Sequence, residues 1–423
     1  MGMSNDIRYS AFELIKRAIR PGLGWPKTWA KAEPKSSYDV VVIGGGAHGL
    51  ATAYYLARNH HIGDILVLER GWLGGGNTGR NTTIIRSDYF LEASANLKEM
   101  ALKLWQGLSR EINYNVMVSQ RGYVDLAHSD GEFEAFILRA NAMRLRGSDV
   151  SMLNRDELRL RVPQLNLDAS ARFPIAGALV QERGGTVRHD AVAWGYARAA
   201  SALGVDIVEQ CAVTGFGMRC GAVETVITDR EKIGVGHVVV SVAGWSSEVA
   251  RMAGIELPVE SIAVQAFVSE PVKPTLDVVV NFNAGLAYVS QTDKGEILLG
   301  GSTEGYNSYA ARGSFVRIEH TVARAIAMFP FMAKLRMMRQ WGGTADISMD
   351  GNAIMGPSPV KNLTLNAGWG YSGFKATPAV GWAIADTVAT GRTHPLIAPF
   401  SIDRFASGAL IDDAGVGPAP FLH

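Results

Sequence analysis

A glycine-rich stretch near the start of the chain has the residue types and the spacing that bind a dinucleotide. The letters VVIGGGAHGLATAYYLA carry Gly44, Gly46 and Gly49 as G-x-G-x-x-G, after an apolar run and before a helical pattern. Glycines in this order permit a tight turn, close approach of the backbone to a pyrophosphate, and close packing of a helix on a strand. Glu69 ends the next apolar run, where its carboxylate can accept hydrogen bonds from ribose hydroxyls. The motif predicts a bound adenine dinucleotide, and by itself it leaves NAD and FAD open.

A second glycine-rich turn, near the end of the chain, favours FAD. The stretch GWGYSGFKATP carries Gly368, Gly370 and Gly373 just before a helix that we expect to begin near Thr377. Such a turn can bring backbone close to a flat ring, and contact from both ends of the chain suits a cofactor that stays bound. Further cofactor contacts are expected, in or beside the glycine-rich segments, from Asn77, Arg80 and Phe374.

Two cations and one histidine could carry further chemistry. Arg86 in NTTIIRSDY and Lys375 in SGFKATP lie in segments expected beside the flavin, and a guanidinium with an ammonium can bind a substrate carboxylate. Both are also residue types that commonly form surface ion pairs. His189 lies between Arg188 and Asp190 before an apolar helical run. A neutral imidazole is a nucleophile near pH 7, but a histidine at such a place is also a common structural or capping residue.

The elements around these residues indicate an α/β fold. Residues 38–69 read as one βαβ unit, helical patterns follow at about 91–111 and 131–146, and residues 262–299 alternate like an antiparallel sheet. A strand, a glycine loop and a helix return in the tail. The predicted division is an N-terminal arm (1–36), a discontinuous FAD-binding domain (37–110, 175–260 and 340–405), a substrate domain (111–174 and 261–339) and a C-terminal tail (406–423).

Composition excludes several classes of partner. The 423 residues are 47% hydrophobic, and 41 basic residues face 40 acidic ones, so no charge bias points to nucleic acid or a membrane. No stretch reaches the ~18 consecutive apolar residues of a membrane span, and we expect no signal peptide. The two cysteines, Cys211 and Cys220, are expected to be reduced thiols in a cytoplasmic protein. We expect no metal site.

The first residues form an unusual arm. Phe12, Ile15 and Ile19 recur at helical spacing beside basic residues, and Trp25 and Trp29 follow among prolines and glycines. Exposed tryptophans are unfavourable unless something covers them. The arm either packs on its own domain or lies on a partner subunit, and we adopt the second interpretation.

The glycine motif, NTTIIRSDY and GWGYSGFKATPAVGWAIAD together resemble the amine-oxidising flavoproteins of the sarcosine oxidase and D-amino acid oxidase family. The resemblance covers nearly the whole chain beyond Ser37, and RGGTVRHDAVAW together with the N-terminal arm makes the sequence look like the beta subunits of bacterial heterotetrameric sarcosine oxidases. It implies an FAD-binding Rossmann-like domain of the glutathione-reductase-related type with an antiparallel-sheet substrate domain.

The resemblance also implies an activity and partners. Sarcosine would be demethylated to glycine, with a hydride passing to noncovalent FAD, electrons to FMN attached covalently at His189, and then O2 reduced to H2O2. Alpha, gamma and delta subunits would complete the enzyme, the alpha subunit binding NAD and tetrahydrofolate, so that formaldehyde or 5,10-methylenetetrahydrofolate is the co-product. Relatives with a single flavin hold the substrate carboxylate at the positions of Arg86 and Lys375.

Other aspects of the resemblance leave alternatives open. A dry aromatic pocket is expected for a neutral amine, with Tyr288, Tyr306 and Tyr371 as candidates to line it. Where monomeric sarcosine oxidases carry an oxygen-activating lysine, this chain has Leu298 and Leu299, and Lys294 is the possible substitute. The alternatives are a self-sufficient FAD-only oxidase of another secondary amino acid and a non-catalytic flavin-binding scaffold subunit.

Overall fold

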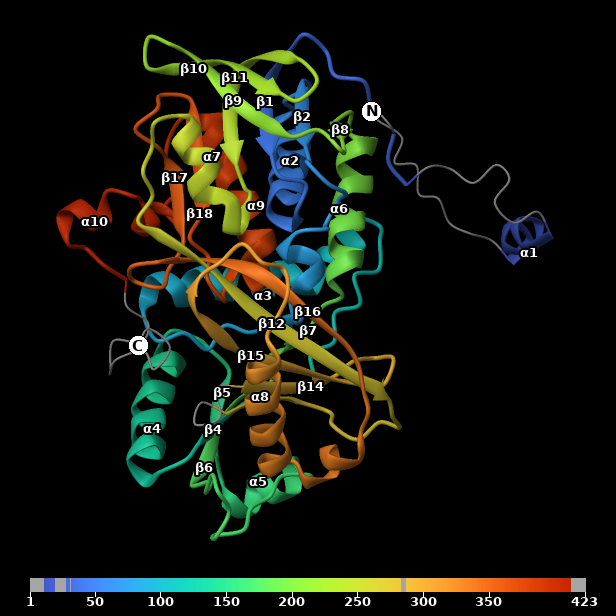
Figure 1. Cartoon of the computed structure of the whole chain (residues 1–423), viewed down its shortest axis with the longest axis vertical. Helices are drawn as coiled ribbons and strands as arrows, with labels where there is room; N and C mark the ends of the chain where they lie inside the picture. Colours follow the sequence, from blue (N-terminus) through green and yellow to red (C-terminus); the bar gives the residue numbers. More distant parts are fainter. Residues whose placement is uncertain (1–10, 20–27, 31, 283–286, 412–423) are drawn as a thin grey trace.

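The computed structural model describes residues 11–19, 28–30, 32–282 and 287–411, and it shows two domains stacked along the long axis of the molecule (Figure 1). The domain at the top of the view is built around a largely parallel sheet, and the lower domain around a largely antiparallel one. The long strands β12 (Val259–Pro271), β15 (Glu296–Asn307) and β16 (Met337–Ser348) cross the middle.

The first sheet has the order β17-β18-β11-β1-β2-β8, and β11, β1, β2, β8 and β18 run parallel. Its central strand is buried on both faces: Val40 and Val42 pack into one core cluster, while Val41 and Ile43 pack into another. This is why the sequence there is a continuous apolar run. The strands are β1 (Ser37–Ile43), β2 (Ile65–Leu68), β8 (Asp206–Val208), β11 (Lys232–Val240), β17 (Ile354–Pro357) and β18 (Leu363–Ala367), with the hairpin β9 (Val213–Arg219) and β10 (Ala222–Thr228) beside β11.

Helices cover both faces of this sheet. One core cluster joins it to α2 (Ala47–His60), α3 (Glu92–Glu111), α6 (His189–Ala202) and α9 (Gly373–Thr390). The other contains residues of α7 (Ser246–Met252), which follows the short turn η2 (Ala243–Trp245), and of the β9–β10 hairpin. The predicted βαβ unit is confirmed, because β1, α2 and β2 follow one another and the two strands pair in parallel.

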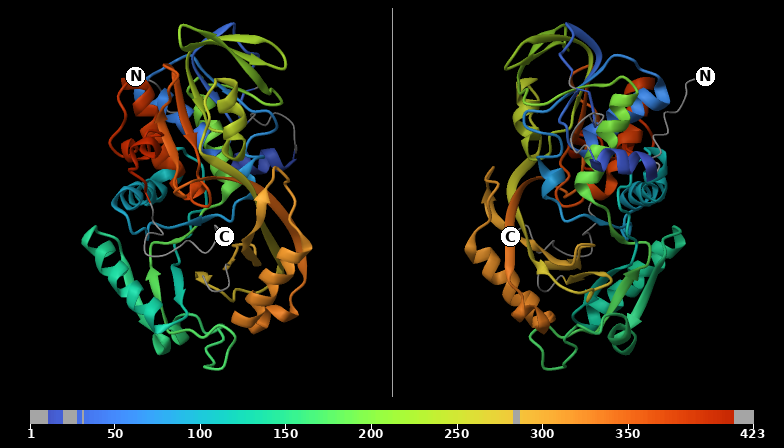
Figure 2. Two further views of the ribbon diagram at one scale, coloured as in Figure 1. Left: turned by 60° about the vertical axis from the view of Figure 1, so that its left-hand side comes forward. Right: turned by 90° about the vertical axis from the view of Figure 1, so that its right-hand side faces the viewer.

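The second sheet has the order β16-β12-β15-β14-β13-β4-β6-β5, and within it only β13 and β4 pair in parallel among the described residues. Figure 2 shows α4 (Asp130–Leu145) and α8 (Phe315–Met328) at the end of the molecule away from the first sheet. The remaining elements here are β4 (Tyr123–Ala127), β5 (Val150–Asn154), α5 (Arg155–Arg161), β6 (Gly177–Gln181), β13 (Val279–Phe282), β14 (Ala287–Gln291) and η4 (Pro330–Lys334). The predicted α/β class with an antiparallel second domain is confirmed.

Two details differ from the sequence expectation. Helix α9 begins at Gly373 rather than near Thr377; Pro378 lacks an N–H, and the Thr377 hydroxyl instead donates to the Phe374 carbonyl at 2.7 Å. The second sheet also contains β6 and the part of β16 from residue 340 onward, which the predicted domain limits at 175 and 340 assign to the other domain. These limits depend on how strands far apart in the sequence pair with one another. The predicted division of the chain into domains stays a prediction.

The two described parts of the N-terminal arm differ in their contacts with the rest of the chain. Trp29 donates its indole N–H to Glu209 at 3.4 Å, and the Ala30 N–H donates to Ser201 at 3.0 Å, so residues 28–30 pack on their own domain. Helix α1 (Ala11–Ile19) instead lies away from the body of the molecule (Figure 1), with Phe12, Ile15 and Ile19 exposed. Trp25 lies outside the described residues.

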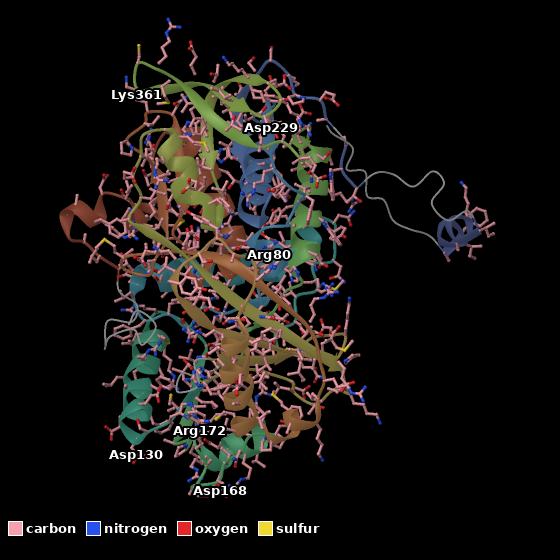
Figure 3. All side chains as sticks on the ribbon, viewed as in Figure 1. Arg80, Asp130, Asp168, Arg172, Asp229 and Lys361 are labelled. Atoms are coloured by element: carbon pink, nitrogen blue, oxygen red, sulfur yellow. The ribbon has the colours of Figure 1, made fainter. Side chains whose placement is uncertain are left out.

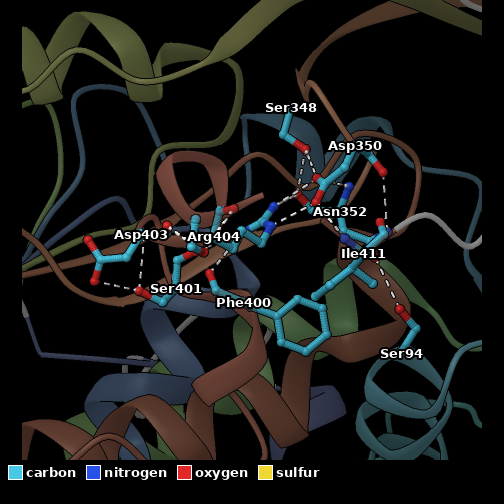
Figure 4. A network of polar contacts seen from close by, with 10 residues as sticks. Ser94, Ser348, Asp350, Asn352, Phe400, Ser401, Asp403, Arg404 and Ile411 are labelled. Carbon is cyan, nitrogen blue, oxygen red and sulfur yellow. Dashed lines mark hydrogen bonds and ion pairs between the residues drawn. The ribbon is translucent and has the colours of Figure 1, made fainter. Parts of the chain in front are cut away.

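A buried ion pair fastens the C-terminal segment to the first domain (Figure 4). Arg404, in the short helix α10 (Arg404–Ser407), forms two bonds of 2.7 and 2.8 Å to Asp350, and both side chains are at most 2% exposed. Asp350 also accepts from the Ile411 N–H at 3.0 Å, and Arg404 donates to the carbonyls of Phe400 and Asn352. One carboxylate thus joins segments about sixty residues apart.

Within the described ranges, no helix is both long and apolar enough to cross a bilayer. Cys211 is buried, Cys220 is exposed, and the two are not joined.

Candidate functional site

A cavity of about 900 Å³ lies between the two domains and brings most of the predicted site residues together. Its lining includes Gly44, Gly46, Glu69, Asn77, Arg80, Arg86, Gly370, Gly373, Phe374 and Lys375. Figure 3 shows Arg80 near the middle of the molecule, far from Asp229 and Lys361 at one end and Asp168 at the other. Gly49 and His189 are predicted site residues that do not line the cavity.

The first glycine turn has the geometry that a pyrophosphate requires. Gly44 has a φ of +111°, and a Cβ there would lie 2.2 Å from the Ser241 carbonyl oxygen, so only glycine fits. Gly49 acts through packing, because its Cβ would lie 2.0 Å from the Gly44 oxygen. Helix α2 begins after Gly46 with no side-chain cap on that residue and no acid in its first turn. Its N-terminal amides and partial positive charge therefore suit an anionic group.

Glu69 is oriented by the backbone around it. Its two carboxylate oxygens accept from the N–H groups of Gly45 and Gly71, at 2.9 and 2.8 Å. A carboxylate has further acceptor capacity beyond these two bonds, so Glu69 can still accept from ribose hydroxyls.

Asn77 and Arg80, in the short turn η1 (Asn77–Arg80), connect the cavity to the second sheet. The Asn77 amide donates to the Thr344 carbonyl at 2.6 Å and accepts from the Thr344 N–H at 3.1 Å. The Arg80 carbonyl accepts from the Trp341 indole at 2.7 Å. These residues therefore fix the position of one domain on the other as well as facing the cavity.

The second glycine turn is held by donors from two other segments, α2 and α3. His48 bonds through Nε2 to the Gly373 carbonyl at 2.9 Å, and Lys98 donates to the Ser372 carbonyl at 2.9 Å. Trp369 donates to the Asn366 oxygen at 2.6 Å, which turns the Asn366 amide toward His48 Nδ1 and leaves the imidazole proton on Nε2. Burial lowers the pKa of His48 to about 4, so this ring is neutral. The N-terminus of α9 is thereby fixed at the cavity wall, where its dipole suits negative charge on a flavin ring.

The far end of the cavity is lined by the cations Arg86 and Lys375, and Lys98, which does not line it, lies close to Lys375; these three residues form the cation cluster. Arg86 bonds to the buried Asp88 at 2.6 Å and lies 4.8 Å from the ring centroids of both Tyr89 and Tyr123. Lys98 is only 3% exposed and lies 4.7 Å from the Trp369 ring. Lys375 donates to the Tyr371 carbonyl at 3.2 Å, and within the described residues it forms no ion pair. The cluster therefore has an excess of positive charge that suits a carboxylate ligand.

Electrostatics support that interpretation. Burial lowers the pKa of Lys375 well below its usual value, and the nearby charges of Arg86 and Lys98 lower it further. An anion bound between these cations would relieve both effects, because it supplies the missing counter-charge.

Sequence reasoning missed Lys98, Tyr123 and His48. A detectable signal existed for Lys98, because it falls on the apolar stripe of α3 with Ala95, Ala101, Leu102 and Trp105 at helical spacing. His48 lies within the glycine motif, but the motif itself assigns roles only to the glycines.

Only some of the residues expected to form the aromatic pocket or the oxygen site line the cavity. Tyr288 and Tyr371 line the cavity, as expected. Tyr306 is 64% exposed and does not line it, so the prediction for Tyr306 is wrong. Burial raises the pKa of Tyr288, and the hydrogen bond that its hydroxyl accepts from Thr82 at 2.9 Å only partly opposes this shift. Leu298 is buried in the second sheet and Lys294 is exposed on a turn, so neither faces the cavity.

His189 is the first residue of α6, three residues after the second strand of a two-strand ladder. Strands β3 (Ile84–Ile85) and β7 (Gly185–Thr186) pair antiparallel, and the Val187 N–H donates to the Thr83 carbonyl at 2.9 Å. Thr83 and Ile84 line the cavity, whereas His189 does not.

Comparison with known proteins shows the family of this chain. Residues 39–387 match the family described as FAD dependent oxidoreductase. The chain is 50% identical over 417 residues to the sarcosine oxidase subunit beta of Rhizobium meliloti (99% of this chain, all of the relative), and 46% identical to that of an Arthrobacter species (92% and 96%).

Solved structures share the fold. L-proline dehydrogenase from P. horikoshii superposes with a TM-score of 0.83 at 26% identity, covering 89% of this chain and all of the other. Glycine oxidase from Geobacillus kaustophilus gives 0.79 at 20% identity, covering 88% and 99%. The chain therefore belongs to the FAD dependent oxidoreductase family, in the group whose curated members are named sarcosine oxidase subunit beta.

Proposed function

We propose that this chain catalyses the oxidative demethylation of sarcosine as the beta subunit of a heterotetramer. The observation that carries the proposal is the pair of cations Arg86 and Lys375 that lines the end of the cofactor cavity, with Lys98 close to Lys375 behind the lining. A small amino acid can place its carboxylate there while its amine lies toward the middle of the cavity.

When bound, FAD supplies an acceptor for a hydride from the N-methyl carbon, after which water releases formaldehyde and leaves glycine. The residues of this chain bind and orient the substrate and exclude water. Arg86 and Lys375 bind and orient the carboxylate, and the dipole of α9 favours the reduced, negatively charged cofactor. Tyr288, Tyr123 and Trp369 exclude water, so that the amine binds in its neutral form.

Replacing Lys375 with methionine should raise the KM for sarcosine or slow anaerobic FAD reduction by at least about tenfold, as expected from losing one charge-assisted contact of ~1.5–3 kcal/mol. Arg86→Gln should do the same. Lys361→Met is the control, because Lys361 is exposed at the far end of the first domain. Reduction is followed by flavin absorbance in a stopped-flow instrument.

A second measurement separates carboxylate binding from general damage. Acetate binding should weaken as pH rises through the lowered pKa of Lys375, because only the ammonium attracts the anion, and Lys375→Met should lose that pH dependence. Unchanged reduction kinetics in both variants would remove these residues from the site.

Two results would favour the alternative functions. Activity of the isolated chain would favour the FAD-only oxidase, and a flavin spectrum that sarcosine leaves unchanged would favour the non-catalytic scaffold subunit.

We further propose that His189 carries FMN covalently. Its Nδ1 is buried with no hydrogen-bond partner in the described part of the chain, and burial lowers its pKa, so the ring is neutral. Arg188 lowers this pKa further and Asp190 raises it; Arg188 and Asp190 are themselves paired at 2.7 and 2.9 Å. Replacing a C–H bond of the flavin 8α-methyl by a C–N bond to the imidazole releases two protons and two electrons, which O2 takes up as H2O2.

The placement of His189 suits a second flavin. Adjacent strands lie ~4.8 Å apart, so the β3–β7 ladder would separate the two cofactors by a short protein layer. Oxygen would then react at the second flavin. This agrees with the position of Lys294, the possible oxygen-activating lysine, which does not line the FAD cavity.

The partners we propose are the alpha, gamma and delta subunits, with NAD and tetrahydrofolate on alpha and 5,10-methylenetetrahydrofolate as the alternative co-product. The relatives' names mark each as one subunit of a larger enzyme. We place the complex in the cytoplasm, in keeping with the two unjoined cysteines.

Deleting residues 1–31 should weaken assembly with the partner subunits and leave FAD in place, because the dinucleotide motif starts later. A sharper variant replaces Phe12, Ile15 and Ile19 with serine, since these side chains are 77%, 59% and 74% exposed and Trp29 keeps its local contact. Size-exclusion chromatography reports the assembly. An intact tetramer after both changes would mean that the arm serves only its own domain.

A further inference from the structure

We propose that Tyr309 is a latch that closes the adenosine end of the cofactor cavity by stacking on Trp245, and that it slows FAD release. The inference rests on the binding of FAD and not on the identity of the substrate.

Tyr309 belongs to a segment fixed on the second sheet. This segment follows β15; the Ser308 N–H donates to the Ser261 carbonyl at 2.8 Å, and the Ala311 carbonyl accepts from the Gly342 N–H at 3.3 Å. Tyr309 lies between these two anchors, so its backbone position is set by the second domain.

Its side chain contacts the first domain instead. The rings of Tyr309 and Trp245 stack with centroids 4.6 Å apart and an interplanar angle of 30°, and the Tyr309 hydroxyl donates to Glu248 at 3.3 Å. Arg70 also stacks on Trp245, at 3.9 Å from its ring centroid. Cation, indole and phenol therefore form one contact that spans the two domains.

This contact lies at a defined end of the cavity. Trp245, Arg70 and Glu248 line the cavity, and Tyr309 covers Trp245 without lining it. Arg70 directly follows Glu69, the residue proposed for the ribose, so Trp245 borders the adenosine half of the cofactor. A dinucleotide leaving by this end must displace the stack or separate the two domains.

The experiment measures FAD release from the complete complex without sarcosine. Protein is diluted, filtered at intervals, and FAD in the filtrate is separated from FMN by chromatography. Tyr309→Ala should release FAD about fivefold to tenfold faster than the unchanged protein, and Tyr309→Phe, which keeps the stack, should stay within about twofold. Tyr306→Ala is the matched control, because this tyrosine is three residues away, 64% exposed and off the cavity.

A second rate separates a latch from general damage. Removing a latch leaves FAD rebinding as fast or faster, whereas a damaged site rebinds FAD more slowly. Tyr309→Ala that releases FAD at the unchanged rate, or that rebinds it more slowly, overturns the proposal. Should Tyr309→Ala fail to assemble, Tyr309→Leu gives the same comparison, and release equal to that of Tyr309→Phe overturns it. Failure of sarcosine oxidation alone leaves these rates unaffected, so the two proposals fail separately.

Discussion

His189→Asn is expected to turn the acid-precipitated chain from yellow to colourless. In the unchanged protein, acid should release FAD from its noncovalent site and leave FMN on a peptide that contains His189. Asparagine has no ring nitrogen to form the bond, so FMN should wash out with FAD. Absorbance of the precipitate and mass spectrometry of its peptides measure the result.

The same variant should separate the two half-reactions. Sarcosine should still reduce FAD anaerobically, because Arg86 and Lys375 line the cavity whereas His189 does not. Steady-state H2O2 production should fall by at least about tenfold, since electrons would lack their exit to oxygen. His320→Asn, at an exposed position of α8, is the control. A colourless precipitate from the unchanged protein, or a flavin peptide elsewhere, would refute the two-flavin proposal.

Arg404→Met is expected to destabilise the first domain by ~3–5 kcal/mol, the range seen when one partner of a buried ion pair is removed. Methionine is of similar length, so the loss comes mainly from leaving the Asp350 carboxylate without its counter-charge in a buried site. For a chain of this size the midpoint of thermal unfolding should fall by about 3–6 °C. Arg219→Met is the control: Arg219 pairs with Glu224 at 2.9 Å but is 73% exposed, and such pairs contribute at most ~1 kcal/mol.

The pH dependence of this loss has a predictable sign. Burial alone would raise the pKa of Asp350, but the bonds from Arg404 and the Ile411 N–H outweigh it and hold that pKa below its usual value. Asp350 therefore stabilises the fold above its unfolded pKa, and the contribution is lost as pH falls through the folded value. In Arg404→Met the carboxyl should protonate more readily, so the deficit should be largest near neutral pH and shrink in acid. An equal loss at all pH values would point to packing instead of charge.

The first domain could be predicted in part because its determinants are local. The apolar run of β1, the turn at Gly44 and the helix after Gly46 are adjacent in the chain, and sterics at a positive φ act on single residues. The start of α9 lies four residues before the position expected from the sequence, because the Thr377 hydroxyl bonds to the carbonyl that the missing N–H of Pro378 would leave free. The domain limits near 175 and 340 depend on which distant strand β6 and β16 pair with, and local patterns carry little of that information.

The sequence by itself determined the α/β class, the dinucleotide motif and the two residues Arg86 and Lys375 that face one cavity. Only the tertiary structure decided that Lys98 lies close to Lys375 behind the cavity lining, that Tyr306 lies outside while Tyr309 contacts Trp245, and that Arg404 is buried against Asp350. The physical reason is the range of the interactions. Backbone preferences act over a few residues, whereas the balance of buried charge and the stacking of rings depend on segments that meet only after the two domains have packed.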